Sequence, residues 1–195
     1  VQYRMHPEIS KFPSQIFYKS KLSDGPDMAS VTSAIWHHRP EFPPYSFFNV
    51  LDGHEKVGRG KSIFNTAEAD AAVALVDMLA SKFPTIKFGG KIGVITPYKQ
   101  QLSHIKSRFT RKFGTDILDM IDFNTVDGFQ GQEKDIIIFS CVRAGPGRGI
   151  GFLADKRRMN VGLTRAKSSL FVLGHAQSLS RSDYWGDLVT DSRRR

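Results

Sequence analysis

Apolar residues recur at helical spacing between residues 65 and 83. They fall on one face of a helix: Ala72, Leu75, Val76 and Leu79. Asn65 and Glu68 stand three residues apart at the start of this stretch, which is the spacing of a capping box. The pattern predicts a helix from Asn65 to Phe83.

Short apolar stretches alternate with helical ones along the rest of the chain. Strands are predicted in YSFFNV, KIGVITP, IDFNTV, KDIIIFSCV and SSLFVLGH. Helices are predicted in YKQQLSHIKSRFTRKF, over residues 155 to 167 and near residues 183 to 191. Such alternation indicates an α/β fold, with a mostly parallel sheet covered by helices on both faces. Residues 26 to 44 show no clear period and are predicted to be an irregular excursion, and residues 193 to 195 a solvated tail.

Polar clusters follow three of the predicted strands: TPYKQQ, NTVDGFQGQEKD and RAGPGRGIG. In open parallel sheets, ligands bind beyond the carboxyl ends of the strands, where loops lead into helices. We therefore expect the decisive functional groups at that edge of the sheet.

The composition fits one basic domain. Of the 195 residues 40% are hydrophobic, which is enough to bury a sizeable core. The formal charge of +9 favours a polyanionic partner, and nucleic acid ranks ahead of a membrane because no long apolar run is present. The single Cys141 allows neither a disulfide framework nor a cysteine metal site, which fits a reducing compartment. No signal peptide is visible, and a start at Val1 rather than Met indicates a piece of a longer protein.

No complete phosphate-binding motif occurs in the chain. Gly60-Lys61-Ser62 resembles the end of a P-loop, but Glu55 stands where the pattern requires glycine. The stretch GPGRGIG lacks the third glycine of a dinucleotide fingerprint and is predicted to be a flexible turn. No apolar strand ends in an acidic residue that could hold magnesium, and the adjacent His37 and His38 do not form a metal site. We predict no metal ligand in this chain.

Several longer stretches, in order, carry a resemblance to a known family. They are VQYRMHPEISKFPS, KIGVITPYKQQ, FNTVDGFQGQEKDIIIFSCVRA and GFLADKRRMNVGLTRAKSSLFVLGH. Together they resemble the second RecA-like domain of superfamily 1 helicases, in the branch that includes the nonsense-mediated decay helicase, and look most like senataxin-type RNA/DNA helicases. The resemblance implies that residues 1 to 195 form the C-terminal RecA-like domain of a larger helicase. The P-loop, the magnesium ligands and the water-activating glutamate would then belong to an upstream RecA-like domain.

The resemblance also assigns roles toward ATP. Arg4 and Arg165 would be arginine fingers that reach the γ-phosphate and neutralise the charge that develops on it. Residues that would bind the rest of the nucleotide are Tyr3, whose ring would stack on adenine, and Gln130, Gly131 and Glu133. Taken alone, Arg4 would be a surface charge, Arg165 a solvated helix face and Glu133 a surface ion pair with Lys134.

A second group would lie along the path of the nucleic acid. By resemblance, its members are Thr96, Tyr98, Lys99, Asn124 and Thr125. Hydroxyl, amide and basic groups suit a protein that grips phosphates and sugars with limited base readout. The alternative for Thr125 is a hydroxyl that satisfies the local backbone. The loop that continues from VDGF into QGQE would touch both the strand and the nucleotide.

The implied function is an ATP- and magnesium-dependent helicase that moves along single-stranded RNA or DNA, 5′ to 3′, and separates RNA:DNA hybrids. A nuclear location, contacts with the transcription machinery and a role in transcription termination follow from the same resemblance. The alternatives are a decay-type or DNA-replication helicase, or a nucleic-acid-binding platform without catalysis. One departure is Gly162, where related helicases commonly carry alanine, because glycine within a helix costs about 1 kcal/mol relative to alanine.

Overall fold

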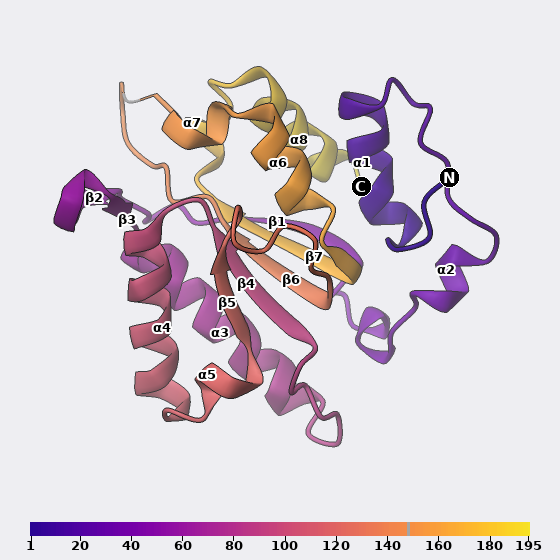
Figure 1. The fold of residues 1–195 in the computed structure, drawn as a ribbon, viewed down its shortest axis with the longest axis horizontal. Helices are drawn as coiled ribbons and strands as arrows, with labels where there is room; N and C mark the ends of the chain where they lie inside the picture. Colours follow the sequence, from indigo (N-terminus) through magenta and orange to yellow (C-terminus); the bar gives the residue numbers. More distant parts are fainter. Residues whose placement is uncertain (148) are drawn as a thin grey trace.

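A sheet of five parallel strands forms the centre of the molecule. The computed structural model describes residues 1 to 147 and 149 to 195. In spatial order the strands are β1 (Tyr45–Asn49), β7 (Ala166–Gly174), β6 (Lys134–Ser140), β4 (Ile92–Thr96) and β5 (Asp122–Thr125). Every pairing between neighbours is parallel, as the near-continuous apolar strands predict (Figure 1).

Helices cover both faces of this sheet (Figure 1). The α-helices are α1 (Pro7–Phe17), α2 (Met28–Val31), α3 (Thr66–Lys82), α4 (Lys99–Phe113), α5 (Ile117–Met120), α6 (Lys156–Leu163), α7 (Ala176–Leu179) and α8 (Asp183–Arg194). Short 3-10 turns are η1 (Ile35–His38), η2 (Arg59–Lys61) and η3 (Gly151–Ala154). A small hairpin of β2 (Lys56–Val57) and β3 (Ile63–Phe64) stands apart from the main sheet. The predicted α/β architecture is confirmed.

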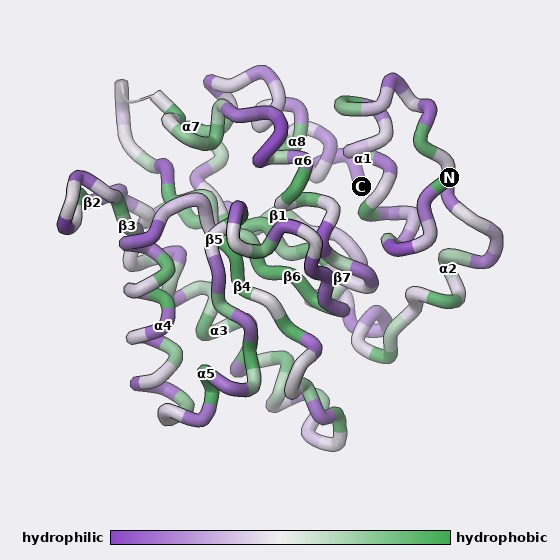
Figure 2. Tube along the Cα trace, viewed as in Figure 1, coloured by the Kyte–Doolittle hydropathy of each residue, from purple (hydrophilic) through white to green (hydrophobic). Residues whose placement is uncertain are grey.

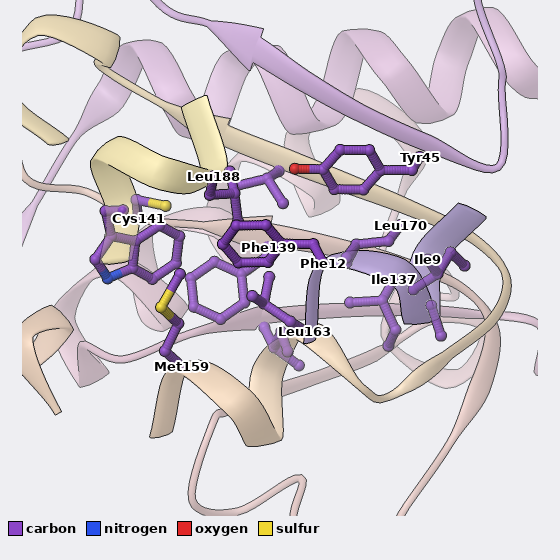
Figure 3. Close-up of a cluster of buried hydrophobic side chains, with 14 of the residues drawn as sticks. Ile9, Phe12, Tyr45, Ile137, Phe139, Cys141, Met159, Leu163, Leu170 and Leu188 are labelled. Atoms are coloured by element: carbon purple, nitrogen blue, oxygen red, sulfur yellow. The ribbon is translucent and has the colours of Figure 1, made fainter. Parts of the chain in front are cut away.

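Alternation along the strands divides the core in two. In β6, Ile137 and Phe139 face the cluster that contains α1, α6 and α8, whereas Ile136 and Ile138 face the cluster under α3 and α4. Figure 2 shows the hydrophobic colour concentrated in the central strands. Figure 3 shows Phe139 on the first face, near Leu163 of α6. A strand buried on both faces cannot shift its register without exposing one of these sets.

The predicted helix from Asn65 to Phe83 is α3, but its capping box is only half formed. The Asn65 side chain accepts a hydrogen bond from the backbone N–H of Glu68 at 3.2 Å. The Glu68 carboxylate does not return to the Asn65 N–H, which donates instead to Gln101. Glu68 is fully buried and accepts hydrogen bonds from Ser140 Oγ and the Val142 N–H, beyond the end of β6. This carboxylate belongs to the tertiary structure as well as to the helix.

The helix predicted over residues 155 to 167 is wrong at its end. Helix α6 stops at Leu163, and β7 already begins at Ala166, where it pairs with Lys134. The Thr164 hydroxyl turns back to the Asn160 carbonyl at 2.8 Å and closes the last turn. Arg165 therefore lies in a two-residue connection and not on a helix face.

Residues 193 to 195 are exposed, as predicted, but they do not form a free tail. Helix α8 continues to Arg194, and the Arg195 side chain pairs with Asp191 at 2.7 Å and with Glu8 of α1 at 3.2 Å. Its guanidinium lies 4.8 Å from the centre of the Tyr45 ring. These contacts join the last helix to the first.

The excursion over residues 26 to 44 contains the short elements α2 and η1. Trp36 and Phe42 from this segment are buried in the core on the α3 side, and Trp36 Nε1 donates to Ser169 Oγ at 3.0 Å. The segment thus covers the sheet although its sequence has no clear period. The predicted turn over residues 145 to 151 includes residue 148, which lies outside the described residues. No helix in the described part of the chain is long and apolar enough to cross a membrane.

Candidate nucleotide and nucleic-acid site

The candidate residues divide between the two ends of the parallel strands. Glu133 immediately precedes β6 and Arg165 immediately precedes β7, so both lie at amino-terminal strand ends. Thr96 ends β4 and Thr125 ends β5, so these lie at the opposite edge. The expectation that the decisive groups gather beyond the carboxyl ends is therefore wrong for Glu133 and Arg165, and for Arg4, which contacts Glu133.

The opening stretch QYRMHP folds into a turn that presents Arg4. The Gln2 side-chain oxygen accepts hydrogen bonds from the backbone N–H groups of Arg4 at 2.9 Å and Met5 at 2.7 Å. Met5 is buried, and the His6 N–H donates to the Lys167 carbonyl of β7 at 2.8 Å. His6 also caps α1 through Nδ1, which accepts from the Glu8 N–H at 3.1 Å. The residues around Arg4 are fixed by the fold, and Arg4 itself extends from them.

Arg4 and Glu133 form an ion pair across 129 positions of sequence. Arg4 Nε donates to Glu133 Oε2 at 2.5 Å, and Arg4 Nη1 donates to the Thr164 carbonyl at 3.1 Å. Lys167 Nζ lies 3.3 Å from the other Glu133 oxygen. The hydrogen bond from Arg4 holds the pKa of the Glu133 carboxyl below its ordinary value, and the charge of Lys167 acts in the same direction. Glu133 is an anion held between two cations.

The alternative partner for Glu133 is excluded by this geometry. Lys134 points away from Glu133 and pairs with Asp122 of β5 at 2.6 Å. Lys167 was not among the predicted site residues. It follows Arg165 by two positions in an extended segment, a spacing that places both side chains on one side of a strand. Because a helix is predicted over these residues, the shared side of Arg165 and Lys167 could not be recognised from their spacing.

Arg165 is half-buried beside this pair. Its Nη2 donates to Thr164 Oγ1 at 3.1 Å, whereas its buried Nε has no hydrogen-bond partner among the described residues. Burial lowers the pKa of the Arg165 guanidinium, and the nearby charge of Arg4 lowers it further, while Glu133 opposes both effects. Arg4 and Lys167 thus contact the Glu133 carboxylate, and the Arg165 guanidinium lies near enough to feel its charge. The arrangement has an excess of positive charge, which suits an anionic ligand.

A cavity of about 340 Å³ opens next to this cluster, and its lining includes Tyr3, Arg4, Glu133 and Lys167. The Tyr3 side chain is 71% exposed. Its ring lies over Gly25, where a Cβ atom would come within 2.4 Å of ring carbon. The ring is thus supported on glycine and offers its remaining surface to solvent.

Gln130 and Gly131 lie in the loop that precedes Glu133. Gln130 is exposed, and Gly131 is exposed with a φ of +82°, a conformation that side chains with a Cβ atom rarely adopt. The glycine lets the chain turn sharply before β6. Neither residue contacts Arg4 or Arg165 in the interactions that hold this cluster.

At the other edge, Thr96 at the end of β4 and Tyr98 just after it are buried beneath the surface. Thr96 is fully buried, and its carbonyl accepts from the Val126 N–H at 3.1 Å. Tyr98 is also buried, with a hydroxyl that accepts from Arg143 Nε at 2.8 Å. Burial raises the pKa of the Tyr98 phenol, against the effect of Arg143. Of the stretch TPYK, only Lys99 is exposed, as the first residue of α4.

Asn124 and Thr125 shape the loop after β5. The Asn124 side-chain oxygen accepts from the Thr125 N–H at 2.8 Å, and Thr125 Oγ1 accepts from the Gly128 N–H at 3.1 Å. A Cβ atom on Gly128 would come within 2.1 Å of the Asn124 side chain, so glycine is required for this approach. The alternative role of Thr125, a hydroxyl bound to the local backbone, is present here.

The same loop joins the two edges. After β5 it buries Val126 and Phe129 in the core on the α6 side and then reaches Glu133 at the start of β6. No α-helix intervenes in this crossover. One short segment therefore connects Asn124 and Thr125 with the ion pair of Arg4 and Glu133.

Comparison with known proteins places the chain in a family. The family model described as an AAA domain matches residues 1–177. The chain belongs to this AAA domain family. Its resemblance to senataxin-type superfamily 1 helicases is confirmed by curated relatives that match nearly the whole of this chain.

Those relatives are much longer proteins. The chain is 50% identical to "Helicase sen1" of Schizosaccharomyces pombe over 192 residues, which covers 98% of this chain and 11% of the relative. It is 50% identical to "Helicase SEN1" of Saccharomyces cerevisiae, covering 100% of this chain and 9% of the relative. It is 38% identical to the human "Probable helicase senataxin", covering 100% of this chain and 7% of the relative. The chain thus spans about a tenth of the first two relatives.

A solved structure supports the fold alone. The C-terminal domain of a possible DNA helicase from Lactobacillus plantarum aligns with a TM-score of 0.51 at 11% identity, covering 89% of this chain and 88% of that one. Together with the parallel sheet, this agrees with a RecA-like α/β domain.

Proposed function

We propose that this chain is the second RecA-like motor domain of an ATP-dependent helicase of the senataxin type, and that Arg4 and Arg165 are its arginine fingers. The observation that carries the proposal is the convergence of Arg4, Glu133 and Arg165 from three distant segments onto one surface. Positive charge exceeds negative charge there, and the Arg165 Nε has no partner within the described structure. Solvation alone does not require charged residues from three distant segments to meet at one place.

The chemistry of arginine suits the departure of a phosphoryl group. Negative charge spreads over the γ-phosphate oxygens in the transition state, and fixed cations lower its energy. Glu133 and the Thr164 carbonyl hold two edges of Arg4, which sets its orientation in advance. The guanidinium of Arg165 is close to Arg4, so an anion between them would relieve their mutual repulsion. Tyr3, Gln130 and Gly131 complete the proposed nucleotide surface, with the Tyr3 ring placed to stack on adenine.

Magnesium and the P-loop are assigned to an upstream RecA-like domain, in line with the resemblance to helicases. When bound, the magnesium ion would neutralise phosphate charge. The fingers of this chain would act across the cleft between the two domains. The 195 residues alone are expected to hydrolyse ATP negligibly.

The carboxyl-terminal edge is proposed to face single-stranded RNA or DNA. Lys99, Asn124 and Thr125 would contact phosphates and sugars, with Thr96 and Tyr98 as the buried support beneath them. The loop through Val126 and Phe129 links this edge to Glu133, so a change in nucleotide state can change the grip on the strand.

The finer assignments rest on the relatives. The chain is 50% identical to each of the two yeast Sen1 helicases, against 40% to the Drosophila "Regulator of nonsense transcripts 1 homolog" and 38% to human senataxin. The preference for the senataxin type over the decay type therefore rests on the yeast relatives. Movement from 5′ to 3′, separation of RNA:DNA hybrids, a nuclear location and work with the transcription machinery in termination belong to this proposal.

The test is nucleic-acid-stimulated ATP turnover by a protein that contains both motor domains, native and with Arg165→Ala. We expect turnover to fall by about 10³-fold or more, while ATP affinity measured separately changes little. Arg157→Ala is the matched control, because Arg157 is an exposed arginine of the neighbouring helix. If the native protein binds nucleic acid but never hydrolyses ATP, the catalytic proposal is wrong and a binding platform replaces it.

A further inference from the structure

A second cavity lies at the carboxyl-terminal edge, beside the proposed strand path. Its volume is about 570 Å³, and its lining includes Lys61, Tyr98, Lys99, Arg143, Phe152 and Arg158. The residues come from four separate parts of the chain: the β2–β3 hairpin, the start of α4, the segment after β6, and the region of η3 and α6. Figure 1 shows this hairpin on the opposite side of the molecule from the N-terminus, near which Arg4 lies.

Phe152 is the unusual member of this lining, because it is a large aromatic residue that is 57% exposed. Its ring centre lies 5.6 Å from that of Tyr98 and 5.4 Å from the Arg158 guanidinium carbon. The next residue, Leu153, is buried, and its carbonyl accepts a hydrogen bond from Trp185 Nε1 at 2.8 Å. The backbone under Phe152 is therefore fixed, and its ring is held at the surface.

Lysines lie on the rim of the same cavity. Arg143 pairs with Glu55 and Arg158 pairs with Asp127, so the two arginines are largely neutralised. Lys61 and Lys99 form no ion pair with any other described residue. The rim thus carries cations without neutralising partners next to an exposed ring.

The hairpin that supplies Lys61 is held against α4. Gly58 packs on Gln100 so closely that a Cβ atom would lie 2.4 Å from the Gln100 side chain. Ser62 Oγ accepts from the Gln100 N–H at 3.3 Å. Lys61 itself has a φ of +60°, a conformation that is uncommon for a residue other than glycine and that persists only where surroundings impose it. The lysine is thus placed beside Tyr98 and Lys99 by the fold.

We infer that this cavity is a base-stacking subsite for single-stranded nucleic acid, in which one base stacks on Phe152 and adjacent phosphates contact Lys61 and Lys99. A flat aromatic ring next to cations without ion-pair partners is the combination that single-strand binders use, because every base has a π face and every linkage a phosphate. The inference rests on the proposed function and deepens it. It also gives Gly60-Lys61-Ser62 a role toward the phosphate of a nucleic-acid backbone in place of the rejected P-loop.

Stacking can be observed directly with Phe152→Trp in the protein that contains both motor domains. In the chain described here, Trp36 and Trp185 are both buried, with 6% and 1% exposure, so a tryptophan at 152 would be the exposed one. The tryptophan emission of the native protein is subtracted from that of the variant. We expect a 12-nucleotide oligouridine to quench this emission at the same concentrations at which it binds by fluorescence anisotropy. A 12-unit abasic phosphate chain should bind without quenching. Binding of oligouridine with no quenching would overturn the inference.

Affinity gives a second, independent readout. Phe152→Leu keeps an apolar side chain but removes the ring, and we expect it to weaken oligouridine binding about tenfold while leaving the abasic chain unaffected. Lys61→Ala and Lys99→Ala should each reduce the slope of log affinity against log salt by about 0.7, with Lys106→Ala, an exposed lysine elsewhere on α4, as the control. Equal losses for oligouridine and the abasic chain in Phe152→Leu would show that the ring has only a structural role.

The outcomes separate this inference from the proposed function. If Arg165→Ala abolishes turnover while Phe152→Leu binds oligouridine like the native protein, the stacking subsite is wrong and the motor assignment stands. If Phe152→Leu lowers turnover without changing oligouridine affinity, the ring serves a contact between domains, which also overturns the subsite. If the native protein binds no oligouridine at all, both proposals fail.

Discussion

The two edges of the central sheet are built in different ways. At the amino-terminal edge, ion pairs between partly exposed side chains hold Arg4, Glu133 and Lys167 together. At the carboxyl-terminal edge, a buried polar network holds the backbone itself. There Glu68 accepts hydrogen bonds from Ser140 and from Val142, which is fully buried with a φ of +71°. A left-handed conformation is strained for a β-branched residue and persists only where its surroundings enforce it.

This difference indicates what each edge can do. Ion pairs among accessible groups can exchange one partner for a phosphate at little cost, because such pairs contribute only about 0 to 1 kcal/mol. A buried network with a strained residue resists rearrangement and keeps a fixed surface. On the proposed function, the amino-terminal edge responds to a nucleotide, and the carboxyl-terminal edge moves with it while keeping its own shape. Four substitutions test this contrast, in order of decreasing effect.

The largest expected effect is that of Arg4→Ala on ATP turnover in the two-domain protein. We expect a loss of about 10³-fold with ATP affinity largely retained, because the charge acts in the transition state. Arg4→Lys should lose nearly as much, since lysine cannot bind Glu133 and present a second edge at once. Turnover is measured by phosphate release, with Arg157→Ala as the control. A fully active Arg4→Lys would show that a point charge is sufficient.

The second effect concerns the buried network. Burial raises the pKa of the Glu68 carboxyl to about 7 from 4.5. Between these values the folded state keeps a proton that the unfolded state has released, so the free energy of unfolding falls as pH rises from about 4.5 to about 7. At about 1.4 kcal/mol per unit, the loss is about 3 kcal/mol. Below about pH 4.5 the contribution of Glu68 to the free energy of unfolding no longer changes with pH, and above about pH 7 that contribution is lost.

The measurement is urea denaturation of the native protein and Glu68→Gln at pH 5 and at pH 8. The amide cannot ionise, so we expect the stability advantage of native over variant to shrink by about 3 kcal/mol at the higher pH. Asp52→Asn, which removes an exposed carboxylate, is the matched control. An advantage that stays constant between the two pH values would show that Glu68 keeps one protonation state, and the contrast between the edges would lose its electrostatic basis.

Much of the fold follows from the sequence, because local periodicity decides it. The buried strands β4 and β6 and the helix α3 are predicted from their apolar patterns, since the strands are buried on both faces and the helix on one. Periodicity does not show where a helix gives way to a strand when the sequence stays polar. For that reason the stretch LTRAK was assigned to a helix, although β7 begins within it.

The location of the site depends on topology and could not be predicted in the same way. The crossover from β5 to β6 contains no helix and returns directly to the start of β6, which brings Glu133 to the amino-terminal edge. The contact between Arg4 and Glu133 joins residues 129 positions apart, and no local pattern encodes it. The resemblance to helicases named both residues, but only the structure shows that one binds the other.

A third, smaller effect tests the helix that connects the edges. Helix α6 carries Arg158, which lines the carboxyl-terminal cavity, and is followed directly by Thr164, whose carbonyl holds Arg4. A Cβ atom on Gly162 would lie 2.2 Å from the Phe139 ring, so glycine is required by packing, against its cost in a helix. We expect Gly162→Ala to destabilise the protein by about 2 kcal/mol rather than to stabilise it. Adding Phe139→Leu should recover part of that loss, because the ring is removed.

Both Gly162 variants are measured by chemical denaturation together with ATP turnover. The pair is informative because Gly162 packs on the Phe139 ring, and Figure 3 shows Phe139 near Leu163, the residue after Gly162. If α6 carries the coupling between the edges, turnover falls with Gly162→Ala and returns with the double substitution. A stabilised Gly162→Ala would mean that helix propensity outweighs the packing conflict.

The smallest expected effect is that of Arg195→Ala, which acts on the amino-terminal edge from outside. Arg195 joins Asp191 of α8 to Glu8 in the first turn of α1, and its guanidinium lies over the Tyr45 ring. Helix α1 begins directly after the turn that presents Arg4, so loosening its first turn should loosen Arg4 as well. We expect a loss of about 1 kcal/mol in unfolding free energy, from the ion pairs and the cation–π contact together.

Arg193→Ala, on the exposed side of α8, is the control. Faster hydrogen exchange at the backbone of residues 4 to 10 in Arg195→Ala, with the residues of β6 unchanged, would place the effect at the amino-terminal edge; an equal change in both would show only a global loss of stability.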